Sequence, residues 1–211
     1  DPAHQARFSD QVIAVSESTK IDLVDYYQID PANISVVHSG TVMSRPTNET
    51  LFEFKKIHNL PERFILHVGT LEPRKNIMGL VRAFNILKAQ TGYQDVELAL
   101  IGKKGWQFQD IFKEIQKSPY QSQIRYLDHV RGDLASYYSL ATVCVCSSFF
   151  EGFGFPTLEA MACGTPVIAS ANSSLLEVVG EAGLFINPYD ISEIAEALEM
   201  VLSEPAIRSR M

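Results

Sequence analysis

Residues 69–76 hold the first side chains whose types and spacing suit chemistry on a charged ligand. The segment starts with Gly69 and Thr70, and the adjacent cations Arg74 and Lys75 stand just before a helical pattern that begins at Asn76. Two positive side chains at the start of a helix favour a phosphate or diphosphate, because the helix dipole and the unpaired backbone amides also attract anions. Taken alone, the segment is better explained as an ordinary solvated basic turn.

Residues 147–159 hold the second group. Glu151 and Glu159 are separated by seven residues, and Gly152 and Gly154 bend the chain between them before Pro156 starts a helix. The backbone amides around residues 153–157 are expected to point at a ligand, and aromatic side chains expected to be exposed at positions 149, 150, 153 and 155 argue against an ordinary solvated loop.

The two carboxylates of this stretch suit a ligand that carries hydroxyl groups. They can accept hydrogen bonds from a sugar or a ribose while the amides hold phosphate, and a carboxylate there can also act as a general acid or base. The alternative is that Glu151 only complements a helix dipole and that Glu159 is an exposed helix residue. A third candidate loop, residues 128–133, is expected to touch a base through its backbone, with His129 more typical of a surface histidine. His67 lies within a predicted strand and is most simply a core-facing side chain.

Composition limits the classes of function. The chain has 211 residues, with 18 basic against 25 acidic side chains and a net charge of −7, which argues against a broad nucleic-acid-binding surface. No apolar run approaches the ~20 residues that a membrane span needs. The three cysteines at 144, 146 and 163 are too few for a disulfide framework and are expected to be buried thiols. No Cys/His spacing suggests a zinc site.

The order of the predicted elements determines where these groups should meet. Short β-branched runs alternate with longer amphipathic stretches, which predicts βαβ units and a parallel sheet. Helix caps are predicted at Ser16 or Ser18, at Asp133, and at Asp190 with Glu193. In such a sheet, ligands bind at the carboxyl ends of the strands, where the candidate loops lie. The predicted strands cover residues 11–15, 34–37, 64–68, 96–101, 124–127, 143–146, 166–169 and 184–186.

A polar stretch at residues 41–48, which contains Pro46, interrupts this alternation and indicates a domain boundary. Residues 1–45 are expected to be a short remnant of a first domain together with a linker, and residues 46–211 a second domain. The second domain is expected to be α/β, with a Rossmann-like parallel sheet and helices on both faces. The start of the chain is polar and has neither an initiator Met nor an apolar signal segment, so we expect a fragment of a longer protein.

The combined motifs resemble those of a known family. Gly69-Thr70-x4-Lys75-Asn76, together with the stretch EGFGFPTLEAMACGTPVIA that starts at Glu151, is similar to the nucleotide-sugar-binding half of a retaining glycosyltransferase of group 1 (family 4) with the GT-B fold. The similarity extends over residues 10–205. It implies two Rossmann-like domains, of which the C-terminal one binds a nucleotide-diphosphate sugar and the N-terminal one binds the acceptor.

The resemblance also implies roles for individual residues. Arg74 and Lys75 would neutralise the diphosphate leaving group, and Glu151 would hold sugar hydroxyls, so these are the predicted catalytic residues. Glu159 would bind the ribose. The other residues predicted to bind the donor are Gly69, Thr70, Val130, Gly152, Phe153, Gly154, Phe155 and Thr157.

The implied reaction is transfer of a sugar, with mannose favoured, from a donor such as GDP-mannose or a UDP-sugar to a saccharide or lipid-linked acceptor. Transfer would retain the anomeric configuration and need no cofactor and no metal. The implied location is the cytoplasm, at the inner face of the membrane, with peripheral attachment through the missing domain. The chain by itself is expected to bind donor without turnover, and no nucleic-acid partner is expected.

Other functions are compatible with such a fold. A sugar-nucleotide epimerase or a phosphorylase of the GT-B fold would use the same crevice. A dinucleotide-binding Rossmann module or a non-catalytic interaction domain is the alternative from another class. Against dinucleotide binding, the loop after Val68 has one glycine where the fingerprint needs three, and no acidic residue ends the strand at residues 96–101.

Overall fold

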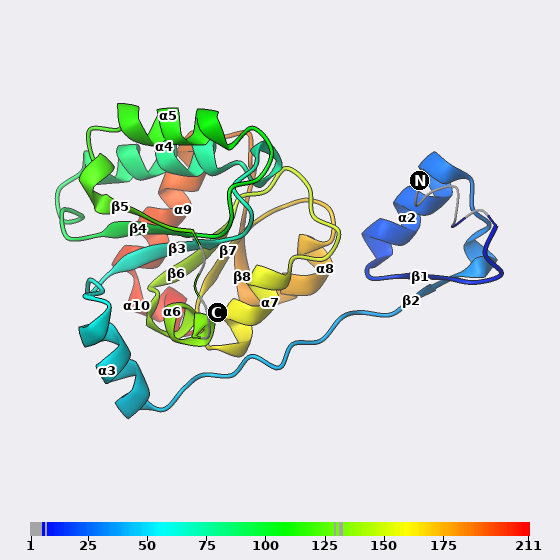
Figure 1. Ribbon diagram of the computed structural model, residues 1–211, viewed down its shortest axis with the longest axis horizontal. Coiled ribbons are helices and arrows are strands. Elements are labelled where there is room, and N and C mark those ends of the chain that lie inside the picture. Colours follow the sequence, from blue (N-terminus) through cyan, green and yellow to red (C-terminus); the bar gives the residue numbers. More distant parts are fainter. Residues whose placement is uncertain (1–5, 7, 129, 131–132) are drawn as a thin grey trace.

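A computed structural model of the chain describes residues 6, 8–128, 130 and 133–211. Within these residues the chain forms a two-stranded parallel sheet near its start and a six-stranded parallel sheet that organises most of the molecule (Figure 1). The predicted fold class, a Rossmann-like parallel sheet with helices on both faces, is confirmed.

The order of strands in the larger sheet is β5-β4-β3-β6-β7-β8. The chain moves outward from β3 through β4 to β5, and then returns to place β6 on the other side of β3. Such a reversal is a topological switch point, where the loops after the two central strands diverge and leave a crevice. The strands are β3 (Phe64–Val68), β4 (Glu97–Ile101), β5 (Ile124–Leu127), β6 (Val143–Cys146), β7 (Val167–Ser170) and β8 (Gly183–Ile186).

Helices cover both faces of this sheet, and the strand side chains alternate between the two cores (Figure 1). Ile65 packs into one core and its neighbour Leu66 into the other. One face is covered by α4 (Ile77–Lys88), α5 (Phe108–Lys117) and α9 (Ile191–Ser203). The other is covered by α3 (Asn48–Ile57), α6 (Leu134–Leu140), α7 (Phe155–Ala162) and α8 (Leu175–Val179), and α10 (Pro205–Arg208) packs against α9. The three cysteines are buried thiols, as predicted.

The predicted cap residues are found at the starts of three helices. The side chain of Ser16 accepts a hydrogen bond from the Thr19 amide, and that of Asp133 accepts one from the Ser136 amide. Asp190 caps α9 in the same way. The short helices α8 and α10 had not been predicted, because five and four residues are too few to show a helical period.

The smaller sheet pairs β1 (Val12–Ala14) with β2 (Ile34–Val36), and α2 (Glu17–Tyr27) packs beside it through Leu23 and Val24. Residues 37–46 have no regular secondary structure and run as an extended segment to α3, which Thr47 caps (Figure 1). The predicted boundary between residues 45 and 46 falls in this segment, and its role as a domain boundary stays a prediction.

Candidate functional site

A charged cluster occupies the switch point, between the loops that follow β3 and β6. Glu151 lies at its centre, and Lys75 Nζ donates to Glu151 Oε1 at 2.5 Å while Arg74 Nη1 donates to Glu151 Oε2 at 2.9 Å. The hydroxyl of Ser148 donates to Glu151 Oε1 at 2.6 Å. The structure brings the three predicted catalytic residues together: Glu151 and Lys75 are only 6% and 8% exposed, and the exposed Arg74 reaches Glu151 from the surface.

The two cations differ in how many of their N–H groups are already used. Arg74 donates to three acceptors: the carboxylate of Glu72, the carbonyl of Phe150 and the carboxylate of Glu151. Lys75 has one hydrogen-bond acceptor among the described residues, which leaves two ammonium N–H groups for a ligand. Lys75 is therefore better placed than Arg74 to bind a diphosphate.

The loop after β7 fixes the backbone of Glu151. The hydroxyl of Ser173 accepts from the Glu151 amide at 3.0 Å, and the hydroxyl of Ser174 donates to the Glu151 carbonyl at 2.8 Å. The side-chain amide of Asn172 donates to the carbonyls of residues 148 and 149. Sequence reasoning missed these three residues, although a polar run directly after a predicted strand is a signal that points to the ligand edge of the sheet.

The surroundings keep Glu151 ionised. Burial by itself would raise the pKa of this carboxyl, but the charge of Lys75 and the hydrogen bonds from Lys75, Ser148 and Arg74 outweigh burial and lower the pKa below its ordinary value. The guanidinium of Arg74 is correspondingly held protonated, with its pKa raised by Glu151 and Glu72 against the effect of burial.

His67 lies below the cluster in β3 and is 1% exposed, which confirms the prediction of a core-facing side chain. Its Nδ1 is 3.1 Å from the carbonyl of Val145, which fits an Nδ1–H donor, and among the described residues its Nε2 has no partner. Burial lowers the pKa of His67 to about 4, so the ring is neutral at neutral pH. Gly69 separates it from Lys75: a Cβ at this glycine would stand 3.7 Å from both His67 Nε2 and Lys75 Nζ.

The start of α7 offers backbone amides to the crevice. Among the described residues, no acceptor is paired with the amides of Gly152, Phe153 or Gly154. Gly154 has φ of 96°, and a Cβ there would stand 2.6 Å from Leu175 Cδ2, so the tight turn before the helix requires glycine. Amides at a helix start are the groups that an anion site needs, and the predicted anion site itself stays a prediction.

Two residues of this turn face inward rather than toward a ligand. Thr157 is fully buried and its hydroxyl donates to the Gly154 carbonyl at 2.7 Å, so its side chain closes the first turn of α7. Phe153 had been expected to be exposed, but it is 6% exposed and packs against Phe155 with ring centroids 5.2 Å apart. Phe155 and Phe150 are exposed, as expected. The predicted contact of Phe153 with the donor is therefore limited to the backbone. The amide of Thr157 also donates to the Gly154 carbonyl, at 3.0 Å, so neither its hydroxyl nor its amide is free for a donor.

Glu159 lies apart from the charged cluster. It is half-buried in α7, and Oε2 accepts a hydrogen bond from the hydroxyl of Tyr138 at 2.8 Å. That contact orients the carboxylate and leaves its other oxygen without a partner among the described residues. The arrangement suits a ligand hydroxyl, as expected for ribose binding.

The remaining predicted donor residues lie along the same edge of the sheet. Gly69 continues the β3–β4 ladder by donating to the Ile101 carbonyl at 2.9 Å, and Thr70 is exposed beyond it. Val130 is half-buried against the core under α6. Its neighbours at positions 129, 131 and 132, including the histidine discussed above, lie outside the described residues.

The small N-terminal unit contacts the loop that carries Glu151. The hydroxyls of Ser16 and Thr19 lie 2.8 and 3.1 Å from the carbonyl oxygen of Gly152, and both can donate to it. Glu177, at the start of α8, accepts from the amides of Glu17 and Ser18. Sequence reasoning missed this contact because it joins segments 136 residues apart.

Within the described ranges, no group of three His, Cys, Asp or Glu side chains is arranged to hold a metal ion. The expectation of transfer without a metal stays a prediction. The described helices include none that is both long enough and apolar enough to cross a membrane.

A Rossmann-like sheet with a charged ligand edge at its switch point defines the chain as the C-terminal domain type of the GT-B fold. The chain belongs to the family described as "Glycosyl transferases group 1", whose sequence model matches residues 48–211. This confirms the resemblance to the group 1 glycosyltransferases, while family 4 and the retaining mechanism stay predictions.

Individual relatives agree with this family. The chain is 33% identical over 201 residues to the O-antigen chain mannosyltransferase B of Escherichia coli, covering 93% of this chain and 52% of that protein. It therefore spans about half the length of that relative. Sucrose-phosphate synthase from Thermosynechococcus elongatus superposes with a TM-score of 0.83 at 28% identity, over 99% of this chain and 55% of the other. HepE of Anabaena, solved in complex with UDP and glucose, has a TM-score of 0.86 at 20% identity, over 97% and 56% of the two chains, and shows the shared fold.

Proposed function

We propose that this chain binds the nucleotide-diphosphate sugar used by a retaining glycosyltransferase, and that the sugar is transferred to a saccharide or lipid-linked acceptor. The observation that carries the proposal is the cluster of Lys75 and Glu151 at the switch point, beside the unpaired amides that precede α7. The similarity to a protein named a mannosyltransferase supports mannose, with GDP-mannose as the first candidate donor. A UDP-sugar is the second candidate, because a structural neighbour was solved with UDP and glucose.

In the proposed mechanism the donor diphosphate takes the two remaining N–H groups of Lys75 and the amides of residues 152–154. Negative charge grows on the diphosphate as the bond to the sugar breaks, and the ammonium and the helix dipole stabilise that charge. Glu151 holds Lys75 in place before the donor binds and accepts hydrogen bonds from sugar hydroxyls afterwards. Glu159 holds the ribose.

Lys75 supplies the positive charge in this proposal, so neither a metal ion nor an organic cofactor takes part. The site for the acceptor ring that receives the new sugar is assigned to parts of the protein outside this chain. We place the reaction in the cytoplasm, at the inner face of the membrane, with any peripheral attachment through those other parts.

A melting-temperature panel tests the proposed ligand class on the 211-residue chain. GDP-mannose, GDP, UDP-glucose and NAD are added separately, because a ligand that binds only the folded state raises the melting temperature. At a ligand concentration of 100 times Kd the expected stabilisation is about 2.7 kcal/mol. A rise with a sugar nucleotide supports the proposal. A rise with NAD alone, or with none of the four, contradicts it.

Product analysis distinguishes transfer from the other reactions of GT-B relatives. The whole protein is incubated with labelled donor and an oligosaccharide acceptor. Label in a longer oligosaccharide with the anomeric configuration of the donor supports the proposal. Label in an epimerised sugar nucleotide or in a sugar phosphate would assign the crevice to an epimerase or a phosphorylase.

A further inference from the structure

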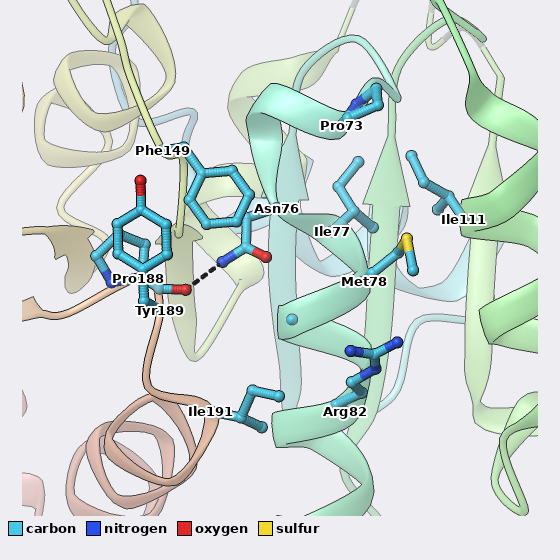
Figure 2. Close-up of a pocket in the computed structure, with 11 residues that line it drawn as sticks. Pro73, Asn76, Ile77, Met78, Arg82, Ile111, Phe149, Pro188, Tyr189 and Ile191 are labelled. Atoms are coloured by element: carbon cyan, nitrogen blue, oxygen red, sulfur yellow. Dashed lines mark hydrogen bonds between the residues drawn. The ribbon is translucent and has the colours of Figure 1, made fainter.

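A groove lies beside the turn Pro73–Lys75, which carries the two cations of the charged cluster (Figure 2). Its cavity of about 300 Å³ is bounded by the start of α4 and by the loop that joins β8 to α9. That volume is at the lower end of the range for small-molecule sites. Figure 2 shows Phe149 and Tyr189 on one side of the groove and Ile77 and Met78 on the other.

The ring of Tyr189 is stacked on that of Phe149 and is the part of this aromatic side that is open to ligands. The rings of Phe149 and Tyr189 are stacked at 27° with centroids 4.9 Å apart, and Tyr189 is 75% exposed. An exposed aromatic face beside aliphatic side chains suits a ligand with an apolar C–H surface. A pyranose ring has such a surface on the face of its axial hydrogens.

The polar groups of the groove suit an uncharged ligand with hydroxyls. Arg82 Nε and Nη2 donate to the carboxylate of Glu114 at 2.8 and 3.0 Å, so the guanidinium charge is neutralised. Arg82 Nη1 and the hydroxyl of Tyr189 have no partner among the described residues and can hydrogen-bond a ligand. A diphosphate or another anion would gain little from this neutralised pair.

The walls of the groove are held in place before any ligand binds. The side-chain amide of Asn76 donates to the Pro188 carbonyl at 2.7 Å, which ties the start of α4 to the β8–α9 loop. The Phe149 amide donates to the Arg74 carbonyl at 2.8 Å, which ties the aromatic wall to the turn that carries the cations. A preorganised site loses less conformational entropy on binding.

These contacts place the groove next to the turn that carries Arg74 and Lys75, since Asn76 directly follows Lys75 and the Phe149 amide is bound to the Arg74 carbonyl. We propose that the groove binds a sugar ring of the saccharide acceptor, beyond the ring that receives the new sugar. This inference rests on the proposed function. A saccharide with its reacting end at the diphosphate then extends over the turn and packs against Tyr189.

Titration of the 211-residue chain with mannotriose, followed by NMR, tests this assignment. Shifts are expected for the amides of residues 76–78 and 189–191. Tyr189→Ala is expected to weaken mannotriose binding by about fivefold, because an aromatic wall is lost. Tyr26→Ala is the matched control, since Tyr26 is equally exposed at 75% and lies in α2. The affinity for the sugar nucleotide is measured on the same samples.

The two measurements separate this inference from the proposed function. Mannotriose binding that Tyr189→Ala weakens and Tyr26→Ala leaves unchanged supports the groove, whether or not the chain binds a sugar nucleotide. Absence of mannotriose binding, or equal binding by the Tyr189→Ala chain, overturns the groove even where sugar-nucleotide binding is intact. A Tyr189→Ala chain that loses sugar-nucleotide affinity instead would assign the groove to the donor and also overturn the inference.

Discussion

The charged cluster around Glu151 and the groove beside Tyr189 share the turn Pro73–Lys75, yet they differ in charge and in the kind of side chain that lines them. The cluster places a nearly buried ammonium and a nearly buried carboxylate 2.5 Å apart. The groove is walled mainly by apolar and aromatic side chains, and its one guanidinium is paired with Glu114. The difference teaches that one edge of a sheet can carry a charged site and a mainly apolar site side by side.

The largest effect is expected from acid. The titrating groups His67 and Glu151 lie at or beneath the charged cluster, so acid should lower the free energy of unfolding through that region. His67 has a pKa of about 4 in the folded chain against 6.5 when unfolded, so between these values the unfolded chain binds more protons. The free energy of unfolding therefore falls as the pH falls from 6.5 to 4, by about 3 kcal/mol in total. Glu151, whose pKa is lowered from 4.5, adds a loss that begins only below that value.

Urea denaturation between pH 7 and pH 4 checks this prediction. The His67→Gln chain, whose amide can still donate to the Val145 carbonyl, is the comparison because it does not titrate in this range. Its unfolding free energy should depend less on pH than that of the original chain. Parallel pH profiles of the two chains would mean that His67 is not held neutral by burial.

Lys75→Ala should sharpen the comparison by affecting the cluster alone. Hydrogen bonds to charged groups contribute about 1.5–3 kcal/mol, so sugar-nucleotide affinity should fall by about 10- to 100-fold. Stability should fall as well, since Glu151 loses its nearest partner. Isothermal titration calorimetry measures the affinity, with the exposed Lys56 in α3 replaced by Ala as the control. Mannotriose binding should be unchanged, and a parallel loss would show that the two regions are not separate.

Glu159→Gln should have a smaller effect, because this carboxylate holds the ribose rather than the diphosphate. The loss of one charge-assisted hydrogen bond predicts a decrease of about tenfold in sugar-nucleotide affinity. The melting temperature should change little, since Gln can still accept the hydrogen bond from Tyr138. Glu196→Gln, on the exposed face of α9, is the control. A sugar diphosphate without ribose is measured on the same two chains. If Glu159→Gln weakens its binding as much as that of the nucleotide sugar, Glu159 does not bind the ribose.

The smallest effect is expected at the contact between the N-terminal unit and the loop after Glu151. Thr19→Val removes the hydroxyl that can donate to the Gly152 carbonyl at 3.1 Å, and should weaken sugar-nucleotide binding by about threefold. Thr19→Ser keeps the hydroxyl and should restore the affinity. Equal affinities for the two variants would mean that Thr19 does not position the loop.

Local signals in the sequence predicted the frame of the site. The strand at residues 64–68 is found at those bounds, and Ser16, Asp133 and Asp190 cap their helices, because alternation and capping depend on neighbours along the chain. The meeting of Lys75 and Glu151 was also predictable, since both follow central strands of a parallel sheet.

The details that sequence reasoning missed depend on contacts between distant segments. Arg74 and Lys75 are adjacent and have the same charge, so the sequence predicts one role for both. Only the fold shows that Glu72 and the Phe150 carbonyl occupy the guanidinium. The inward positions of Phe153 and Thr157 depend in the same way on packing around the start of α7.

A crystal structure of the chain with GDP-mannose or UDP-glucose tests the central claim most directly. The account predicts diphosphate oxygens within hydrogen-bonding distance of Lys75 Nζ and of the amides of residues 152–154, with Glu151 turned toward the sugar. A diphosphate bound elsewhere, with the Lys75–Glu151 pair left intact, would contradict it.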